Sequence, residues 1–116
     1  MIAKKYRFHG HNSLRRVLAS GSMSRSKFFT VKWTTNERRH HPRLSGVVSK
    51  KVFKSAVKRN RVRRRIYEIA RPLLNDALAV DIVVIVHATD ALEASHDELT
   101  IQLLPLLHET GLKPKR

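Results

Sequence analysis

Apolar side chains recur at helical spacing in three segments of the chain. A short helix is expected over 14–20, a long one within 49–71, and a last one that Ser95 opens with a capping box. Pro72 and Pro105 should end, kink or split the second and third helices. The stripes expected to be buried are Leu14, Val17 and Leu18; Val62, Ile66, Ile69, Ala70, Leu73 and Ala77; and Leu99, Leu103, Leu106 and Leu107.

Three other segments carry the pattern of β-strands. The segment 26–35 alternates between an apolar and a mainly polar face, and 43–49 follows as a second strand. The segment 81–88 is β-branched and apolar on both faces, so it should lie in the centre of a sheet. In the first strand the core face would carry Phe29, Val31 and Trp33, and the other face Phe28, Thr30, Lys32 and Thr34.

The order helix, strand, strand, long helix, strand, helix predicts an α+β fold. A single small sheet of about four strands, with the helices packed on one face, is the economical arrangement and leaves the other face open. The chain of 116 residues fits one domain. Within this domain, 1–12 reads as an extended basic arm and 112–116 as a loose basic tail.

The charge changes the picture, because 24 Lys and Arg face only 9 acids and give a net charge of +15. An anionic partner that relieves this self-repulsion is expected, with nucleic acid first and an anionic membrane surface second. The chain has no cysteine, which excludes disulfides and thiolate metal sites. It shows no secretory signal and no apolar run long enough to span a membrane, so we expect a cytoplasmic protein.

The positive charge concentrates in 49–71, which contains a single acid, Glu68. Its arginines repel one another at i, i+3 and i+4 without intervening glutamates, so a merely solvated face is a poor explanation. Arginine dominates the segment after Lys58, and its guanidinium suits bidentate contacts with phosphate. Two arginines, Arg59 and Arg63, lie near the apolar stripe, which indicates that the start of this helix overhangs the sheet.

The strands on both sides of the basic helix disfavour a helix-turn-helix DNA reader. An open sheet face with an aromatic beside basic residues is more typical of single-stranded RNA binding, because exposed bases stack on rings. Phe28 is the candidate for stacking, with Lys32 nearby for the backbone; the alternative is that Phe28 is buried under the N-terminal arm. Tyr6 and Phe8 in the arm could add aromatic contacts or pin the arm down.

The sequence offers no catalytic set of its own. His9, His11, His40 and His41 lack accompanying acids and lie in basic stretches that repel cations, so we expect no protein-borne metal site. Paired carboxylates, a Ser-His-Asp set and a phosphate-cradling glycine loop are not apparent. If catalysis is involved, another component should carry it.

The segment "SKKVFKSAVKRNRVRRRIYEIAR" resembles the signature of the bacterial ribonuclease P protein subunit, with Ser49-Lys50-Lys51-Val52 followed by Ala56-Val57-Lys58-Arg59-Asn60-Arg61. More weakly, "SLRRVLASGSMSRSKFFTVKW" and "DIVVIVHA" are similar to the first helix and two strands of that family. Two features depart from the pattern. Leu14 and Leu18 stand where the first helix usually has an aromatic, and the second strand has Arg43-Leu44-Ser45 with its glycine one position later, at Gly46.

The resemblance implies a ferredoxin-like or ribosomal-protein-like fold with a left-handed strand-helix-strand crossover around the basic helix. It implies a subunit of ribonuclease P that binds the catalytic RNA and the 5′ leader of precursor tRNA. That holoenzyme is an endoribonuclease; its RNA carries the Mg²⁺-dependent hydrolysis, and Mg²⁺ would be held mainly by RNA phosphates. The expected partners are these two RNAs, without membrane or DNA, and the protein would be a monomer in the holoenzyme.

The resemblance also assigns residues to the two RNAs. Contacts to the catalytic RNA would come from Lys50, Lys51, Lys54, Lys58, Arg59, Asn60, Arg61, Arg64 and Arg65. The leader would lie between the first helix and the open sheet face, against Phe8, Phe28 and Lys32. Two other classes fit the charge: a ribosome-associated RNA-binding protein without a processing role, and a DNA-binding or nucleoid protein.

Overall fold

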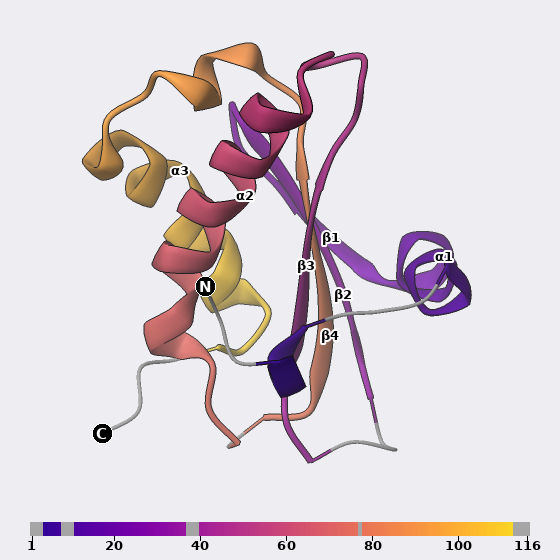
Figure 1. Cartoon of the computed structure of the whole chain (residues 1–116). Helices are drawn as coiled ribbons and strands as arrows, with labels where there is room; N and C mark the ends of the chain where they lie inside the picture. The colour runs from indigo at the N-terminus through magenta and orange to yellow at the C-terminus, as the bar shows by residue number, and fades with distance from the viewer. Residues whose placement is uncertain (1–3, 8–10, 37–39, 77, 113–116) are drawn as a thin grey trace.

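A four-stranded mixed sheet separates two unequal layers of helices in the computed structural model, which describes residues 4–7, 11–36, 40–76 and 78–112 (Figure 1). The predicted α+β class with a single small sheet is confirmed. The helices are α1 (His11–Ser20), α2 (Ala56–Ala70) and α3 (His96–Glu109), with 3₁₀ turns at Lys4–Tyr6, Arg71–Leu73 and Thr89–Leu92. The strands are β1 (Ser22–Arg25), β2 (Phe29–Thr35), β3 (Arg43–Val48) and β4 (Val80–Val86).

The strand order is β1-β2-β4-β3, with β4 in the interior of the sheet as its apolar sequence predicts. The pairs β1–β2 and β2–β4 are antiparallel, whereas β3 runs parallel to β4 and α2 connects these two strands. The left-handed sense of this crossover stays a prediction. The register places alternate residues of each strand on the face that carries α2 and α3 and on the face that carries α1.

The α2 and α3 side holds the main core. The predicted cap of α3 is confirmed, since the amide of Glu98 donates to Ser95 Oγ over 3.0 Å. The α2 helix has a similar cap, in which the amide of Lys58 donates to Ser55 Oγ over 3.3 Å. The α2 helix ends before Pro72, whereas α3 continues through Pro105 as one helix and is not split. The buried side chains include Phe29, Val31, Leu44, Val62, Ile66, Ile69, Ala70, Ile82, Val84, Leu99, Leu103 and Leu107. Ala77 lies outside the described residues.

The first helix departs from the expected packing, because α1 lies against the other face of the sheet (Figure 1). Val17 is fully buried against Val83 of β4, with Leu14 and two further strand residues around them. The reason is the central strand, which is apolar on both faces, so the second face also needs cover. No helix within the described ranges is long and apolar enough to cross a membrane.

Candidate nucleic-acid interface

The outward side of α2 and the turn before it form a basic surface. Amides of Val52 and Phe53 donate to the Ser49 carbonyl over 3.1 and 3.2 Å and fold this turn. Val62 and Ile66 bury the opposite side of the helix, which fixes the polar side toward solvent. The structure brings the following predicted residues together as exposed side chains: Lys50, Lys51, Lys54, Lys58, Asn60, Arg61 and Arg64.

Arg59 and Arg65 differ from their neighbours, because each is half-buried and bonded to backbone carbonyls. Arg59 donates to the carbonyls of Phe53 and Lys54, both over 2.9 Å, and so ties the turn to the helix. Arg65 donates to the Leu92 carbonyl over 2.8 Å and to those of Ala91 and Ala94. Both arginines therefore stabilise the fold of the chain itself. Their contact with RNA stays a prediction.

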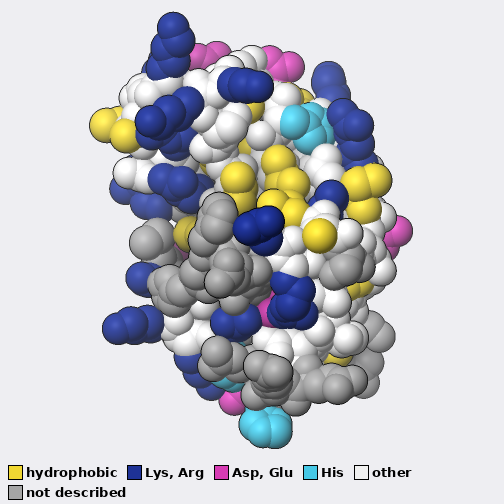
Figure 2. Space-filling view, turned by 90° about the vertical axis from the view of Figure 1, so that its right-hand side faces the viewer, with side chains coloured by type: hydrophobic (Ala, Val, Ile, Leu, Met, Phe, Trp, Pro, Cys, Tyr) yellow, Lys and Arg dark blue, Asp and Glu magenta, His cyan; other side chains and the backbone are white. Residues whose placement is uncertain are grey.

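The second candidate surface is the α1 face of the sheet. The register puts Met23, Thr30, Lys32, Val47, Val83 and Ile85 on this face. Met23 is 61% exposed and Leu18 of α1 is 38% exposed, so apolar surface reaches solvent here. Figure 2 shows this side of the molecule, where hydrophobic side chains gather near the centre and Lys and Arg surround them. Such a surface can take up bases between flanking phosphate contacts.

Lys32 lies on the α1 face, where its sequence position placed it. Its ammonium donates to the Leu18 carbonyl over 3.0 Å, near the end of α1. This bond satisfies a carbonyl that the helix leaves open, and it suits the partial negative charge of a helix C-terminus. Lys32 therefore links the helix to the sheet in the free protein. Phe8 lies outside the described residues.

The expectation that Phe28 is an exposed stacking residue is wrong. Its side chain is 1% exposed and belongs to the main core, with its ring edge-to-face against Phe29 at 6.2 Å. The strand starts at Phe29 and not at Ser26, and the chain bends over Lys27 and Phe28. Alternation does not extend through this bend, so both neighbouring rings enter the core.

A buried carboxylate fastens α1 to the sheet. Asp81 of β4 is fully buried on the α1 face and accepts two hydrogen bonds from Arg43 of β3, both over 2.8 Å. The amide group of Asn36 donates to the same carboxylate over 3.0 and 2.9 Å. Arg16 of α1 completes the cluster at 2.5 Å. One carboxylate thus joins two strands and the short helix.

The pKa of Asp81 results from opposing effects. Burial alone would raise it, but hydrogen bonds from Arg43 and Asn36 and the positive charges of Arg43 and Arg16 outweigh burial. The pKa therefore lies below its usual range. The carboxylate is charged at neutral pH, and its partners are needed to keep it so.

The N-terminal arm docks on the free edge of β3. Arg7 forms a parallel bridge with Leu44, and the ammonium of Lys5 and the hydroxyl of Tyr6 each reach Asp76 at 3.0 Å. Both bonds, that of Lys5 first, hold the pKa of Asp76 below its ordinary value. Of the two roles left open for Tyr6, the structure supports the one that pins the arm.

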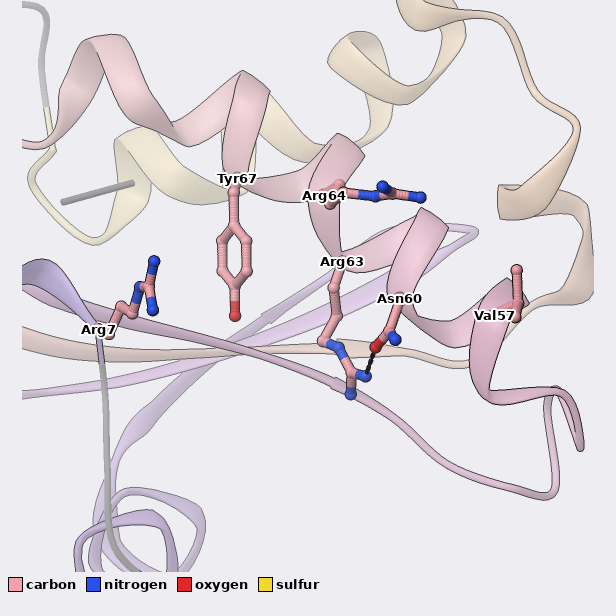
Figure 3. A pocket seen from close by; sticks show the side chains of 6 residues that line it. All are labelled: Arg7, Val57, Asn60, Arg63, Arg64 and Tyr67. Atoms are coloured by element: carbon pink, nitrogen blue, oxygen red, sulfur yellow. Dashed lines mark hydrogen bonds between the residues drawn. The ribbon is translucent and has the colours of Figure 1, made fainter. Parts of the chain in front are cut away.

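A hollow of about 490 Å³ opens between this arm and α2 (Figure 3). Its lining combines Arg7 with five residues of α2: Val57, Asn60, Arg63, Arg64 and Tyr67. Asn60 and Arg64 were predicted to contact RNA, whereas the other lining residues were not. Arg63 was placed near the apolar stripe and Tyr67 was given no role. The sequence signal for Tyr67 is an aromatic side chain within a basic helix, but the arm that closes the hollow is distant in sequence.

Among the described residues, no group of three His, Asp or Glu is arranged to hold a metal ion. The basic surface also has few acids nearby. Glu68 pairs with Arg71 over 3.0 Å, toward the end of α2. Within the described part of the chain, no acidic side chain pairs with Lys58, Arg61 or Arg64, so these charges are available to an anionic partner.

Comparison with known proteins gives the same family throughout. The family model described as Ribonuclease P matches residues 2–111. The "Ribonuclease P protein component" of Thermus scotoductus is 39% identical over 95 residues, covering 82% of this chain and 54% of that protein. The Pseudanabaena protein of the same name is 30% identical over 107 residues, covering 92% of both chains. The chain thus spans about half to three fifths of the length of the first curated relatives.

Solved structures show the same fold. An RNase P protein of Staphylococcus aureus, a mutant with defective mRNA degradation activity, superposes with a TM-score of 0.83 at 28% identity, covering 95% of this chain and 92% of that one. The RNase P protein from Thermotoga maritima gives 0.76 at 26% identity, covering 89% and 96%. With the matching family model and the shared sheet topology, these likenesses establish that the chain belongs to the family of bacterial ribonuclease P protein components.

Proposed function

We propose that this chain is the protein subunit of a ribonuclease P ribonucleoprotein and binds the catalytic RNA through the basic surface of α2. The observation that carries the proposal is the set of exposed cations on one side of a helix whose other side is locked into the core. A rigid helix holds these charges at fixed spacing, which suits a partner with regularly spaced phosphates. Guanidinium groups such as those of Arg61 and Arg64 bind phosphate oxygens in pairs.

The 5′ leader of precursor tRNA would lie on the α1 face. Lys32 supplies a cation there, and Leu18 and Met23 supply exposed apolar surface for the bases. Phe28 has no part in this, because it is buried. Phe8 remains a further candidate from the sequence.

The proposed chemistry is hydrolysis of the phosphodiester bond between leader and mature tRNA, performed by the RNA. Mg²⁺ would be held mainly by RNA phosphates, and no catalytic residue is assigned to this chain. Its contribution is to neutralise phosphate charge and to position the leader, which lowers the Mg²⁺ concentration that the RNA needs. The chain would act as a monomer in the cytoplasm.

The test is cleavage of a precursor tRNA by a bacterial ribonuclease P RNA at low Mg²⁺, with and without this protein. We expect cleavage at the mature 5′ end only when the protein is present. Mature tRNA and precursor tRNA can then be compared as competitors, and the difference between them shows whether the leader adds affinity. Binding without any stimulation would favour the ribosome-associated alternative, and equal competition by duplex DNA would favour the DNA-binding one.

A further inference from the structure

The hollow between α2 and the N-terminal arm is a built feature of this chain. Val57, Asn60, Arg64 and Tyr67 follow one another at spacings of three and four, so they form a single stripe along α2. Arg7, on the arm, faces this stripe across the opening (Figure 3). A ligand in the hollow would be held between two elements that lie far apart in sequence.

Gly46 of β3 lies next to two of the lining residues, Arg63 and Tyr67. The Gly46 amide donates to the Tyr67 hydroxyl over 3.3 Å, so the ring is held at the edge of the strand. A Cβ at Gly46 would lie 3.3 Å from Cγ of Arg63, which is a tight contact, and 3.8 Å from the Tyr67 hydroxyl, which is an ordinary one. The absence of a side chain at Gly46 therefore gives the stem of Arg63 room to lie close to the strand.

The lining has the chemistry of a nucleotide site. Three of the six lining residues, Arg7, Arg63 and Arg64, carry guanidinium groups, and none of the six is acidic. Arg63 donates to the side-chain oxygen of Asn60, which orients its planar group. Planar guanidinium groups bind phosphate oxygens in pairs, and an aromatic ring offers a stacking surface to any base.

Two further observations limit the size and kind of ligand. The volume of about 490 Å³ falls in the usual range for small-molecule sites, roughly 300–1,000 Å³, and suits one nucleotide but not a double helix. Val57 is 65% exposed, an apolar side chain in the middle of a basic surface. It can contact a sugar or the face of a base, which a surface made only for phosphates would not require.

Resting on the proposed function, in which the partner of α2 is an RNA, we propose that this hollow receives a single unpaired nucleotide of the catalytic RNA. Its base would stack on Tyr67 and its phosphate would lie among Arg7, Arg63 and Arg64. The basic surface of α2 would then recognise one unpaired nucleotide in addition to the charge of the RNA backbone. This contact would fix the position of the protein along the RNA.

Affinity for the catalytic RNA tests the stacking contact. Tyr67→Leu should weaken binding about tenfold or more, because it removes the ring, yet leave the salt dependence unchanged, because it removes no charge. Tyr67→Phe keeps the ring and should bind within about twofold of the unaltered chain. Arg64→Ala should lower the slope of log affinity against log salt by about one. Lys27→Ala, a charge change before β2 and away from the hollow, is the matched control.

Crosslinking tests the position independently of folding defects in the Tyr67 variants. The chain has no cysteine, so Val57→Cys can carry a single photoreactive group, with Lys27→Cys as the control. We expect the Val57→Cys protein to crosslink to one or two adjacent unpaired nucleotides of the catalytic RNA.

Several outcomes would overturn the proposal. They are unchanged affinity of Tyr67→Leu, an equal loss in Tyr67→Phe and Tyr67→Leu, or crosslinks confined to base-paired nucleotides. Failure of the unaltered chain to bind the RNA at all would overturn the proposed function as well. Normal binding and stimulation of cleavage by Tyr67→Leu would overturn the nucleotide site alone.

Discussion

The two faces of the sheet are covered in different ways. On one face, α2 and α3 bury a continuous core that includes residues of β2, β3 and β4. On the other, Val17 is the fully buried side chain among those described in α1, and Arg16 fastens this helix to a buried carboxylate, Asp81. The basic surface of α2 therefore stands on a rigid base, whereas the α1 face depends on few contacts.

We relate this difference between the two faces to the two RNAs of the proposed function. Fixed charges are effective when the helix that carries them cannot move, because their spacing then matches that of the partner. Under the proposed function the leader lies on the α1 face, where the exposed apolar side chains would suit bases of varied sequence. Each prediction below alters one face and asks whether the other responds.

The largest effect is expected from Asp81→Asn. The substitution removes the buried charge that Arg43 shares, and breaking such a pair costs about 3–5 kcal/mol. Chemical denaturation should show this loss of stability, and hydrogen exchange should rise first in α1. The Lys5–Asp76 pair is exposed, so Asp76→Asn is the matched control and should cost far less. Equal losses in the two variants would contradict the role given to Asp81.

Acid should reproduce that effect in the unaltered chain. The pKa of Asp81 is lowered in the folded state, so its contribution to stability is present above the unfolded pKa, about 3.9, and is lost as the pH falls through the folded value. We expect the free energy of unfolding to decrease below about pH 5 in denaturant titrations. Asp81→Asn should flatten this decrease. An unchanged pH profile in that variant would show that other carboxylates dominate.

Removing exposed cations from the α2 surface should lower the affinity for RNA and should not lower the stability of the fold. Arg61→Ala combined with Arg64→Ala should weaken binding of the catalytic RNA about 100-fold, since each charged hydrogen-bonding contact contributes roughly 1.5 kcal/mol or more. Filter binding across a salt series measures this loss. Arg59→Ala should instead lower stability, because that side chain holds the Phe53 and Lys54 carbonyls. An unchanged melting temperature of the Arg59→Ala variant would contradict this stabilising role of Arg59.

Two valines allow a matched test of the thin cover on the α1 face. Val17 is fully buried and Val57 is 65% exposed, so the same truncation to alanine has different consequences. We expect Val17→Ala to cost roughly 1–3 kcal/mol and Val57→Ala almost nothing. Thermal unfolding of both variants measures the difference. Similar melting temperatures would mean that α1 adds little to the fold.

The smallest effect concerns the free protein. Crowded arginines on α2 repel one another, so the chain without RNA should be partly unfolded at low ionic strength and gain structure with sulfate or pyrophosphate. Circular dichroism should show a modest increase in helix signal. Arg61→Ala combined with Arg64→Ala should reduce the response. A spectrum that does not change with sulfate would contradict the prediction.

Much of this organisation was predictable from local pattern. The apolar stripe of α2, the cap at Ser95 and the run of β4 depend on residues close in sequence, and the motif around Asn60 indicated the family. The predicted strand over 26–35 was partly wrong, because a bend over Lys27 and Phe28 interrupts the alternation. The polar strand β1 carries no periodic signal, and only its pairing with β2 makes it a strand.

The sequence by itself determined the fold class, the basic helix and its family. Only the tertiary structure decided which cations face outward, where Phe28 lies and which face α1 covers. The reason is the distance of the partners along the chain: Arg65 reaches carbonyls 26 to 29 residues away, and Arg16 meets a carboxylate 65 residues away. Periodicity places a side chain on a side of its own helix or strand. What that side meets is set by packing against distant segments.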